Sequence, residues 1–152
     1  MKKELLTNFF NKEAGKHLIK GDKVLFLWPE EAILQDQTCK KILEPYEILQ
    51  LPNMYYLPFF RLGRDFDAII CFDMLHRVPD PYMLLMNMLQ CIKPGGVIFL
   101  NTKKPNNNIN KEDFFVIDYI YLVNIFKKLG FQIIQGDENG YKYIIKKQEQ
   151  EI

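Results

Sequence analysis

Short apolar runs separated by helical stretches constrain the fold more than any other feature of this sequence. Residues 67–72 (DAIICF) and 97–100 (VIFL) are typical of buried strands, and between them a largely apolar helix is expected to start at Pro79-Asp80-Pro81. Further strands are predicted at 23–28, 46–51, 131–135 and 141–147. Strands that alternate with helices form a parallel sheet with helices on both faces, so the sequence predicts an α/β fold. The last two strands are expected to form a hairpin, which makes the final strand antiparallel.

Length and charge bound the organisation of the chain and its partners. The 152 residues are expected to form a single domain (1–152), with an N-terminal helix within residues 1–20 and a frayed tail at 148–152. Apolar residues make up 48% and charged residues 26%, which excludes disorder across the whole chain. Twenty basic and nineteen acidic residues give a formal net charge of +1, so nucleic acid is not an expected partner.

The cysteines and the N-terminal residues bear on location and on metal binding. Cys39, Cys71 and Cys91 lie in apolar settings and none is part of a C-x-x-C motif, which fits a reducing compartment. Two histidines and three widely spaced cysteines do not form a zinc pattern, so no metal site is expected. The first 18 residues carry charge throughout and contain no apolar segment typical of a signal peptide. We therefore expect a cytoplasmic protein without a membrane partner.

Four motifs follow one another within residues 66–96. They are Phe66-Asp67-Ala68-Ile69-Ile70, Asp73-Met74-Leu75-His76-Arg77, Pro79-Asp80-Pro81 and Ile92-Lys93-Pro94-Gly95-Gly96. This segment resembles the central third of the class I S-adenosylmethionine (SAM)-dependent methyltransferases. Leu57-Pro58-Phe59 upstream and Leu129-Gly130-Phe131 near the end of the chain are also similar to that family. The resemblance implies a shortened Rossmann-like methyltransferase fold, with a mostly parallel sheet, helices on both faces and a C-terminal antiparallel strand.

The part of the chain that would bind the cofactor departs from the family. In the methyltransferase family, the first strand runs into a Val-Leu-Asp-x-Gly-x-Gly-x-Gly loop, whose glycines let the backbone approach the cofactor closely. In this chain the acidic position is Phe26, and the three glycine positions are Trp28, Glu30 and Ala32. Glu30 and Glu31 are expected on the first turn of a helix, in the field that would otherwise receive the cofactor's carboxylate. We therefore interpret these positions as a degenerate cofactor site, in which Trp28 fills space.

The acid that binds the cofactor's ribose in the family also has no counterpart. Between Trp28 and Phe66 the chain has room for about one helix and one strand, so the family's second strand and its helix look deleted or merged. Glu47 is the only acidic residue in strand 46–51, and it does not lie at the strand's end. Without this acid and the glycine loop, no SAM binding is expected.

Asp73, His76 and Arg77 are the candidate catalytic residues. They follow the central strand 67–72, at the edge where open α/β sheets bind ligands. Their side chains are suited to acid/base work or to orienting a substrate. The alternative is that they only cap the loop. Residues 106–108 and 110, all asparagines after strand 97–100, are either substrate contacts or part of a polar loop.

Apolar side chains without an evident place in the core indicate a protein partner. In the helix 82–92, Tyr82, Leu85, Leu89 and Ile92 are expected to face the sheet, which leaves Met83 and Met86 outward. Together with Phe9 and Phe10 of the N-terminal helix, these methionines are the predicted surface for a homodimer or for another protein. The alternative is that the N-terminal helix covers Met83 and Met86.

Three hypotheses for function follow. The first is a methyltransferase-like protein that has lost SAM binding, is not an enzyme, and acts as a binding or stabilising subunit. The second is an active small methyltransferase that uses SAM in an atypical pocket. The third is a binder of another small ligand in the vacated cleft.

Overall fold

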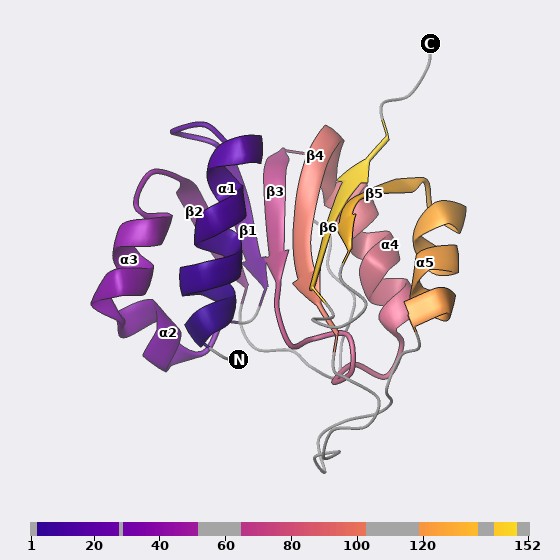
Figure 1. Ribbon diagram of the computed structural model, residues 1–152, viewed down its shortest axis with the longest axis horizontal. Helices are drawn as coiled ribbons and strands as arrows, with labels where there is room; N and C mark the ends of the chain where they lie inside the picture. The colour runs from indigo at the N-terminus through magenta and orange to yellow at the C-terminus, as the bar shows by residue number, and fades with distance from the viewer. Residues whose placement is uncertain (1–2, 28, 52–64, 103–118, 137–141, 149–152) are drawn as a thin grey trace.

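The computed structural model describes residues 3–27, 29–51, 65–102, 119–136 and 142–148, and Figure 1 shows their arrangement. The helical elements are η1 (Leu5–Phe10), α1 (Asn11–His17), α2 (Glu31–Gln35), α3 (Gln37–Leu43), α4 (Pro81–Cys91) and α5 (Tyr119–Lys128). The strands are β1 (Lys23–Leu27), β2 (Glu47–Leu51), β3 (Phe66–Cys71), β4 (Ile92–Asn101), β5 (Phe131–Gly136) and β6 (Lys142–Lys147). All six predicted strands are present, and their ends differ from the predicted ones by one residue at most, except at the start of β4.

The six strands form one sheet in the order β2-β1-β3-β4-β6-β5. Strands β2, β1, β3 and β4 run parallel, and β6 is antiparallel to both of its neighbours. Val24 pairs with Ala68 and Leu25 with Ile69, as expected from adjacent central strands. The predicted α/β fold, mostly parallel and with an antiparallel final strand, is confirmed.

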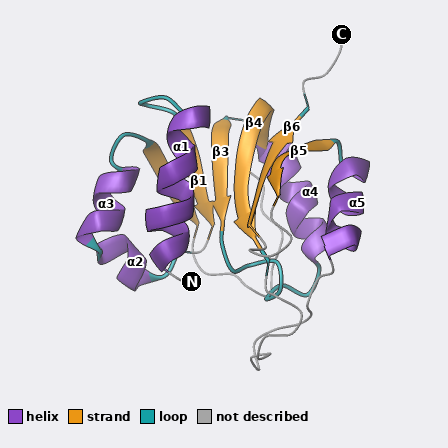
Figure 2. Ribbon diagram, viewed as in Figure 1, coloured by secondary structure: helices purple, strands orange, loops and turns teal. Residues whose placement is uncertain are grey.

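Helices cover both faces of the sheet, because the strands alternate apolar side chains between two cores. Figure 2 shows α1, α2 and α3 on one side of the sheet and α4 and α5 on the other. Phe26, Ile70 and Phe99 belong to the core beneath the N-terminal helices. Their neighbours Leu25 and Ile69 belong to the core beneath α4 and α5.

The N-terminal helix lies against the sheet rather than presenting a surface. The predicted single helix is a π-helical segment, η1, that continues into α1. Phe9 and Phe10 are 6% and 0% exposed, and their rings contact Phe72, Phe99 and Tyr46. The prediction that Phe9 and Phe10 contribute to a partner surface is therefore wrong, because the sheet's own aromatic side chains bury them.

The helix predicted to hold Glu30 and Glu31 on its first turn is followed by a second helix, and the two meet at Asp36. Asp36 has an extended backbone (ψ 128°), and its carboxylate accepts a hydrogen bond from Cys39 N at 3.0 Å, which makes it the N-cap of α3. Lys3 Nζ lies 2.9 Å from the same carboxylate. The hydrogen bond from Lys3, and then the one from the Cys39 backbone, lower the pKa of Asp36 to about 2. This acidic cap joins the N-terminal segment to α3.

Helix α4 and strand β4 follow each other without a separate turn. Residues 93–96 lie between the predicted helix 82–92 and the predicted strand 97–100, but Ile92 already pairs with Phe66 and the register then shifts to Ala68 and Val97. Gly95 has φ +83°, a left-handed conformation that glycine adopts without strain. The segment is therefore a bulge within β4.

The C-terminal end of α4 is held by a lysine from the far end of the chain. Lys147 is 8% exposed, and its Nζ donates to Leu89 O at 2.9 Å and to Ile92 O at 3.1 Å. These carbonyls lie at a helix C-terminus, where a cation is favoured. The last described strand therefore stabilises the helix that covers it.

The outer side of α4 differs in part from the expectation. Leu84, Leu85 and Met88 are fully buried, whereas Tyr82 is 45% exposed, so Tyr82 does not face the sheet. Met83 is 40% exposed and Met86 is half-buried. The N-terminal helix packs on the opposite face of the sheet and does not cover either methionine.

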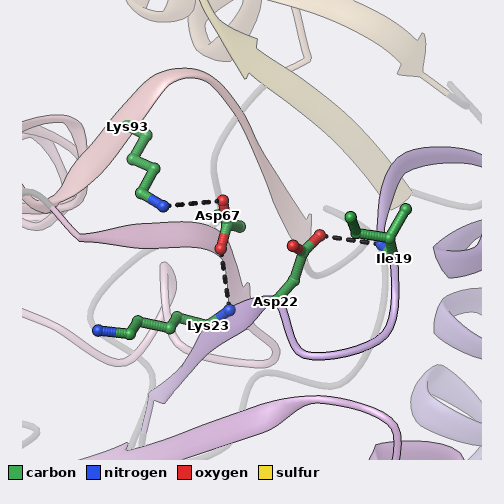
Figure 3. Close-up of polar contacts among 5 residues, drawn as sticks. All are labelled: Ile19, Asp22, Lys23, Asp67 and Lys93. Carbon is green, nitrogen blue, oxygen red and sulfur yellow. Dashed lines mark hydrogen bonds and ion pairs between the residues drawn. The ribbon is translucent and has the colours of Figure 1, made fainter.

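A carboxylate joins three strands at the amino edge of the sheet (Figure 3). Asp67 accepts hydrogen bonds from the Lys23 backbone N at 2.9 Å and from Lys93 Nζ at 3.2 Å. Beside it, Asp22 accepts a hydrogen bond from Ile19 N at 2.9 Å and orders the entry to β1. This cluster lies at the starts of β1, β3 and β4, the edge opposite the one at which parallel sheets bind ligands.

The three cysteines and the described helices bear on the expected location. Cys39, Cys71 and Cys91 are free and buried, and burial raises the pKa of Cys39 to about 11 and that of Cys91 to about 12. Of the helices in the described residues, none is both long and apolar enough to cross a bilayer.

Candidate functional site

The chain reverses its direction of travel across the sheet between β1 and β3. From β1 it passes to β2 on one side, and then returns to place β3 on the other side of β1. Open α/β sheets bind ligands at such a switch point, outside the carboxyl ends of the strands. The segments that follow β1 and β3 are therefore the place to look for a site.

The segment after β1 is short and contains no glycine. β1 ends at Leu27 and α2 begins at Glu31. Phe26 is fully buried beneath the N-terminal helices, so the position that matches the family's acid belongs to the core. Ala32 is exposed. The prediction that Trp28 fills the place of the cofactor loop lies outside the described residues.

Glutamates stand at the start of α2. Glu30 is the N-cap residue, with an extended backbone (φ −69°, ψ 142°), and Glu31 is the first helical residue. The sequence placed both on the first turn, and the structure moves Glu30 one position earlier. Since α2 has only five residues, its dipole is weak, and the two carboxylates add negative charge at its positive end.

The carboxyl end of β2 offers no acid. Glu47 is the first residue of β2 and is in register with Lys23, the first residue of β1, so it lies at the amino edge. Strand β2 ends at Leu51, and the sequence contains no further acidic residue before Asp65. An acid that could bind ribose hydroxyl groups beside β1 is therefore missing at this position.

The half of the edge formed by β3 and β4 is built from polar side chains. Asp73 follows β3 in a left-handed conformation, φ 56°, which is uncommon for a residue with a side chain. Its backbone N donates to Asn101 Oδ1 at 2.7 Å, and Asn101 Nδ2 donates to Asp73 Oδ1 at 2.8 Å. This reciprocal pair joins the loop after β3 to the end of β4.

His76, Arg77 and Thr102 lie on the two segments that this pair joins. His76 is 5% exposed and Thr102 is 5% exposed, whereas Arg77 is half-buried. The Arg77 backbone N donates to Met74 O at 3.0 Å, which closes a turn that includes His76. The candidate catalytic residues Asp73, His76 and Arg77 thus lie on one loop at the switch point. Their role in a reaction stays a prediction.

Sequence reasoning missed Asn101 and Thr102. The signal was available, because both residues come directly after the buried run VIFL, where polar side chains reach the carboxyl edge of the sheet. The asparagines at 106–108 and 110, expected to be either substrate contacts or part of a polar loop, lie outside the described residues. Asn101 is 7% exposed and its partner is 28 residues away, so only the fold shows the pair.

Comparison with known proteins matches residues 22–135 to the model of a family described as a methyltransferase domain. A ubiquinone biosynthesis O-methyltransferase of Coxiella burnetii is 35% identical over 63 residues, which are 41% of this chain and 26% of that relative. The matched part of the chain therefore spans about a quarter of this curated relative.

Solved structures at low identity share the fold. A SAM-dependent methyltransferase of Thermotoga maritima, described as a possible histamine N-methyltransferase, is 14% identical with a TM-score of 0.61, over 97% of this chain and 91% of that one. A 1,6-didemethyltoxoflavin-N1-methyltransferase of Burkholderia thailandensis, solved with S-adenosylhomocysteine, is 11% identical with a TM-score of 0.63, over 97% of this chain and 78% of that one.

Proposed function

Since the chain belongs to the methyltransferase domain family, we propose that it keeps this fold as a binding scaffold and does not bind SAM. The observation that carries the proposal is the segment from Leu27 to Glu31, where a buried strand enters a five-residue helix without a glycine. SAM carries a carboxylate, which the carboxylates of Glu30 and Glu31 would repel at the start of α2.

The β2 side adds an independent reason. SAM carries a ribose whose hydroxyl groups need a polar partner once they leave water. The carboxyl end of β2 ends in Leu51, and Glu47 lies at the opposite edge of the sheet. A cofactor placed beside β1 would therefore lose hydration at both its carboxylate and its ribose without compensation in the described residues.

An active methyltransferase is the second candidate, and one observation favours it. The loop after β3 is held by the Asp73–Asn101 pair and carries the buried His76, which is an ordered polar arrangement at the switch point. Such a loop could orient a substrate if the cofactor bound in an atypical way. Cofactor binding is therefore the measurement that separates the two candidates.

In calorimetric titration with SAM and with S-adenosylhomocysteine, we expect no saturable heat, which corresponds to a dissociation constant above about 1 mM. The Burkholderia thailandensis enzyme, solved with S-adenosylhomocysteine, serves as the positive control. The double variant Trp28→Gly, Glu30→Gly should not gain binding, because the β2 side still lacks an acid. Micromolar binding to the unmodified chain would overturn the proposal in favour of the active enzyme.

A scaffold without a cofactor needs a partner, and the outer side of α4 is the proposed surface. Met83 is 40% exposed beside Tyr82, and a flexible thioether suits a surface that adapts to another chain. Met86 is half-buried and contributes less area. The partner is a second copy of this chain or another protein, as expected from the sequence. Phe9 and Phe10 are not part of the proposed surface, because they are buried.

Light scattering on the purified chain tests this surface. We expect a mass above that of a monomer, alone or with a partner recovered from cell extract, and a return to the monomer when Met83→Glu places a charge in the interface. Tyr121→Glu, at an exposed position on α5, is the matched control and should leave the mass unchanged. A monomer that recovers no partner would remove the support for α4 as a docking surface.

A further inference from the structure

Two buried polar atoms at the carboxyl edge of the sheet lack a hydrogen-bond partner within the described residues. Within the part of the chain that the structure describes, neither Arg77 Nε nor Thr102 Oγ1 has a hydrogen-bond partner, although both atoms are buried. Buried polar atoms of folded proteins are nearly always satisfied, and each exception needs an explanation, such as a bound ion or ligand. These two are the observation from which the inference starts.

The two groups belong to segments that the structure holds together. Thr102 follows Asn101 directly, and Arg77 closes the turn that begins after Asp73. The reciprocal Asp73–Asn101 hydrogen bonds, at 2.7 and 2.8 Å, join these two segments. Both lie beyond the carboxyl ends of adjacent parallel strands, where α/β sheets bind ligands.

The chemistry of the two groups selects the ligand. A guanidinium only donates hydrogen bonds and always carries a positive charge, and a threonine hydroxyl is able to donate as well. No ion pair joins Arg77 to a carboxylate among the described residues, and Asp73 accepts a hydrogen bond from Asn101 Nδ2 through Oδ1. Two donors, one of them cationic, match the acceptor oxygens of a carboxylate or phosphate group.

We infer that Arg77 and Thr102 form a site for an oxyanion, the carboxylate or phosphate group of a small molecule. The inference goes beyond the proposed function, because the site lies on the β3 and β4 half of the edge and does not depend on the segment after β1. Thr102 is 5% exposed, and Arg77 Nε is itself buried although the residue as a whole is half-buried, so both groups contact only a ligand that enters the edge of the sheet. The nearby Asp73 carboxylate opposes an anion, and we therefore expect modest affinity for the isolated group.

The test is an NMR titration of the full chain with inorganic phosphate and, separately, with acetate, at constant ionic strength. We expect saturable shifts of the Arg77 Nε–H and Thr102 amide signals, with a dissociation constant of about 1 mM for the better ligand. The ligand that binds more tightly identifies the acid group that the site prefers. Shifts that do not saturate, or that spread evenly over the surface, would overturn the inference.

Matched variants make the test specific. Arg77→Gln is expected to weaken binding at least about tenfold, and Thr102→Val about threefold, since the valine keeps the shape and removes the hydroxyl. Lys127→Gln removes the same single charge from the exposed end of α5 and should leave the affinity unchanged. If Arg77→Gln does not fold, Arg77→Lys keeps the charge, loses the forked geometry and should bind with intermediate affinity. Unchanged affinity in the Arg77→Gln variant would show that the anion binds elsewhere, and would overturn the inference.

The two proposals fail separately. Micromolar SAM binding would overturn the proposed function and leave the oxyanion site standing if phosphate or acetate still shifts Arg77 in the presence of saturating SAM. Absence of any oxyanion binding would overturn the site and leave the calorimetric result on SAM unaffected.

Discussion

Replacing Phe99 with alanine is expected to lower the free energy of unfolding by about 3–5 kcal/mol, the usual loss when a buried aromatic side chain is deleted. Phe99 is fully buried in β4, and its ring centroid lies 4.9 Å from that of Phe10 and 6.2 Å from that of Phe9. It also contacts the ring of His17 at 6.2 Å. The substitution removes the ring against which the N-terminal helix packs, so the helix loses its docking surface along with the apolar contacts.

Urea unfolding followed by circular dichroism measures this loss. For a domain of this size, each kcal/mol corresponds to roughly 2–4 °C in Tm, so a thermal melt gives an independent value. Phe99→Leu retains most of the buried volume and should cost less than half as much, whereas Tyr121→Ala, at a position 61% exposed, should change stability by less than about 0.5 kcal/mol. A loss below about 1 kcal/mol for Phe99→Ala would contradict the packing of the N-terminal helix on the sheet.

Gly96→Ala is expected to destabilise the protein by about 3 kcal/mol, the upper end of the usual cost of overpacking, because the added methyl group has no room. A Cβ at Gly96 would lie 2.6 Å from Ile92 Cγ1, 2.9 Å from Lys93 O and 3.0 Å from Asp67 O. Two of these three atoms are backbone, one in the bulge of β4 and one in β3, so the sheet itself must shift to accommodate the substitution.

The same substitution at Gly15 should have the opposite sign. Gly15 lies in α1, and a Cβ there meets nothing within 4 Å. Alanine is a better helix former than glycine by roughly 0.5–1 kcal/mol, so Gly15→Ala is expected to stabilise the chain. Comparing the two alanine variants by urea unfolding separates the close approach at Gly96 from the general effect of replacing a glycine. Equal effects at the two positions would contradict the close packing of the bulge.

The motifs that the middle of the chain shares with the family have structural roles. Asp67 joins the starts of the strands, and Asp80 is the N-cap of α4, where its carboxylate accepts from Met83 N at 3.0 Å. Pro81 begins the same helix, and Gly96 allows the close approach just described. These motifs build the fold whether or not a reaction takes place, which is why the match to the family and the proposed absence of SAM binding are compatible.

Of the candidate site, the sequence indicated the loop and only part of its contents. Asp73, His76 and Arg77 could be placed after the central strand because strand ends follow from the apolar run before them. Asn101 and Thr102 could not be tied to that loop, since parallel strands bring their carboxyl ends together only through the sheet register. The pairing of Asp73 with Asn101, across 28 residues, is a consequence of that register.

The sequence by itself determined the order and type of the elements, because apolar periodicity, proline and glycine act over a few neighbouring residues. The run DAIICF had to be a buried strand, and Pro81 after Asp80 had to begin a helix. Tertiary structure alone decided where the aromatic side chains went. Phe9 and Phe10 have the same local pattern as an exposed apolar face, and they are buried because the chain folds them against Phe99, some ninety residues later. Burial depends on which distant surface covers a side chain, and that information is a property of the assembled sheet and not of any local stretch of sequence.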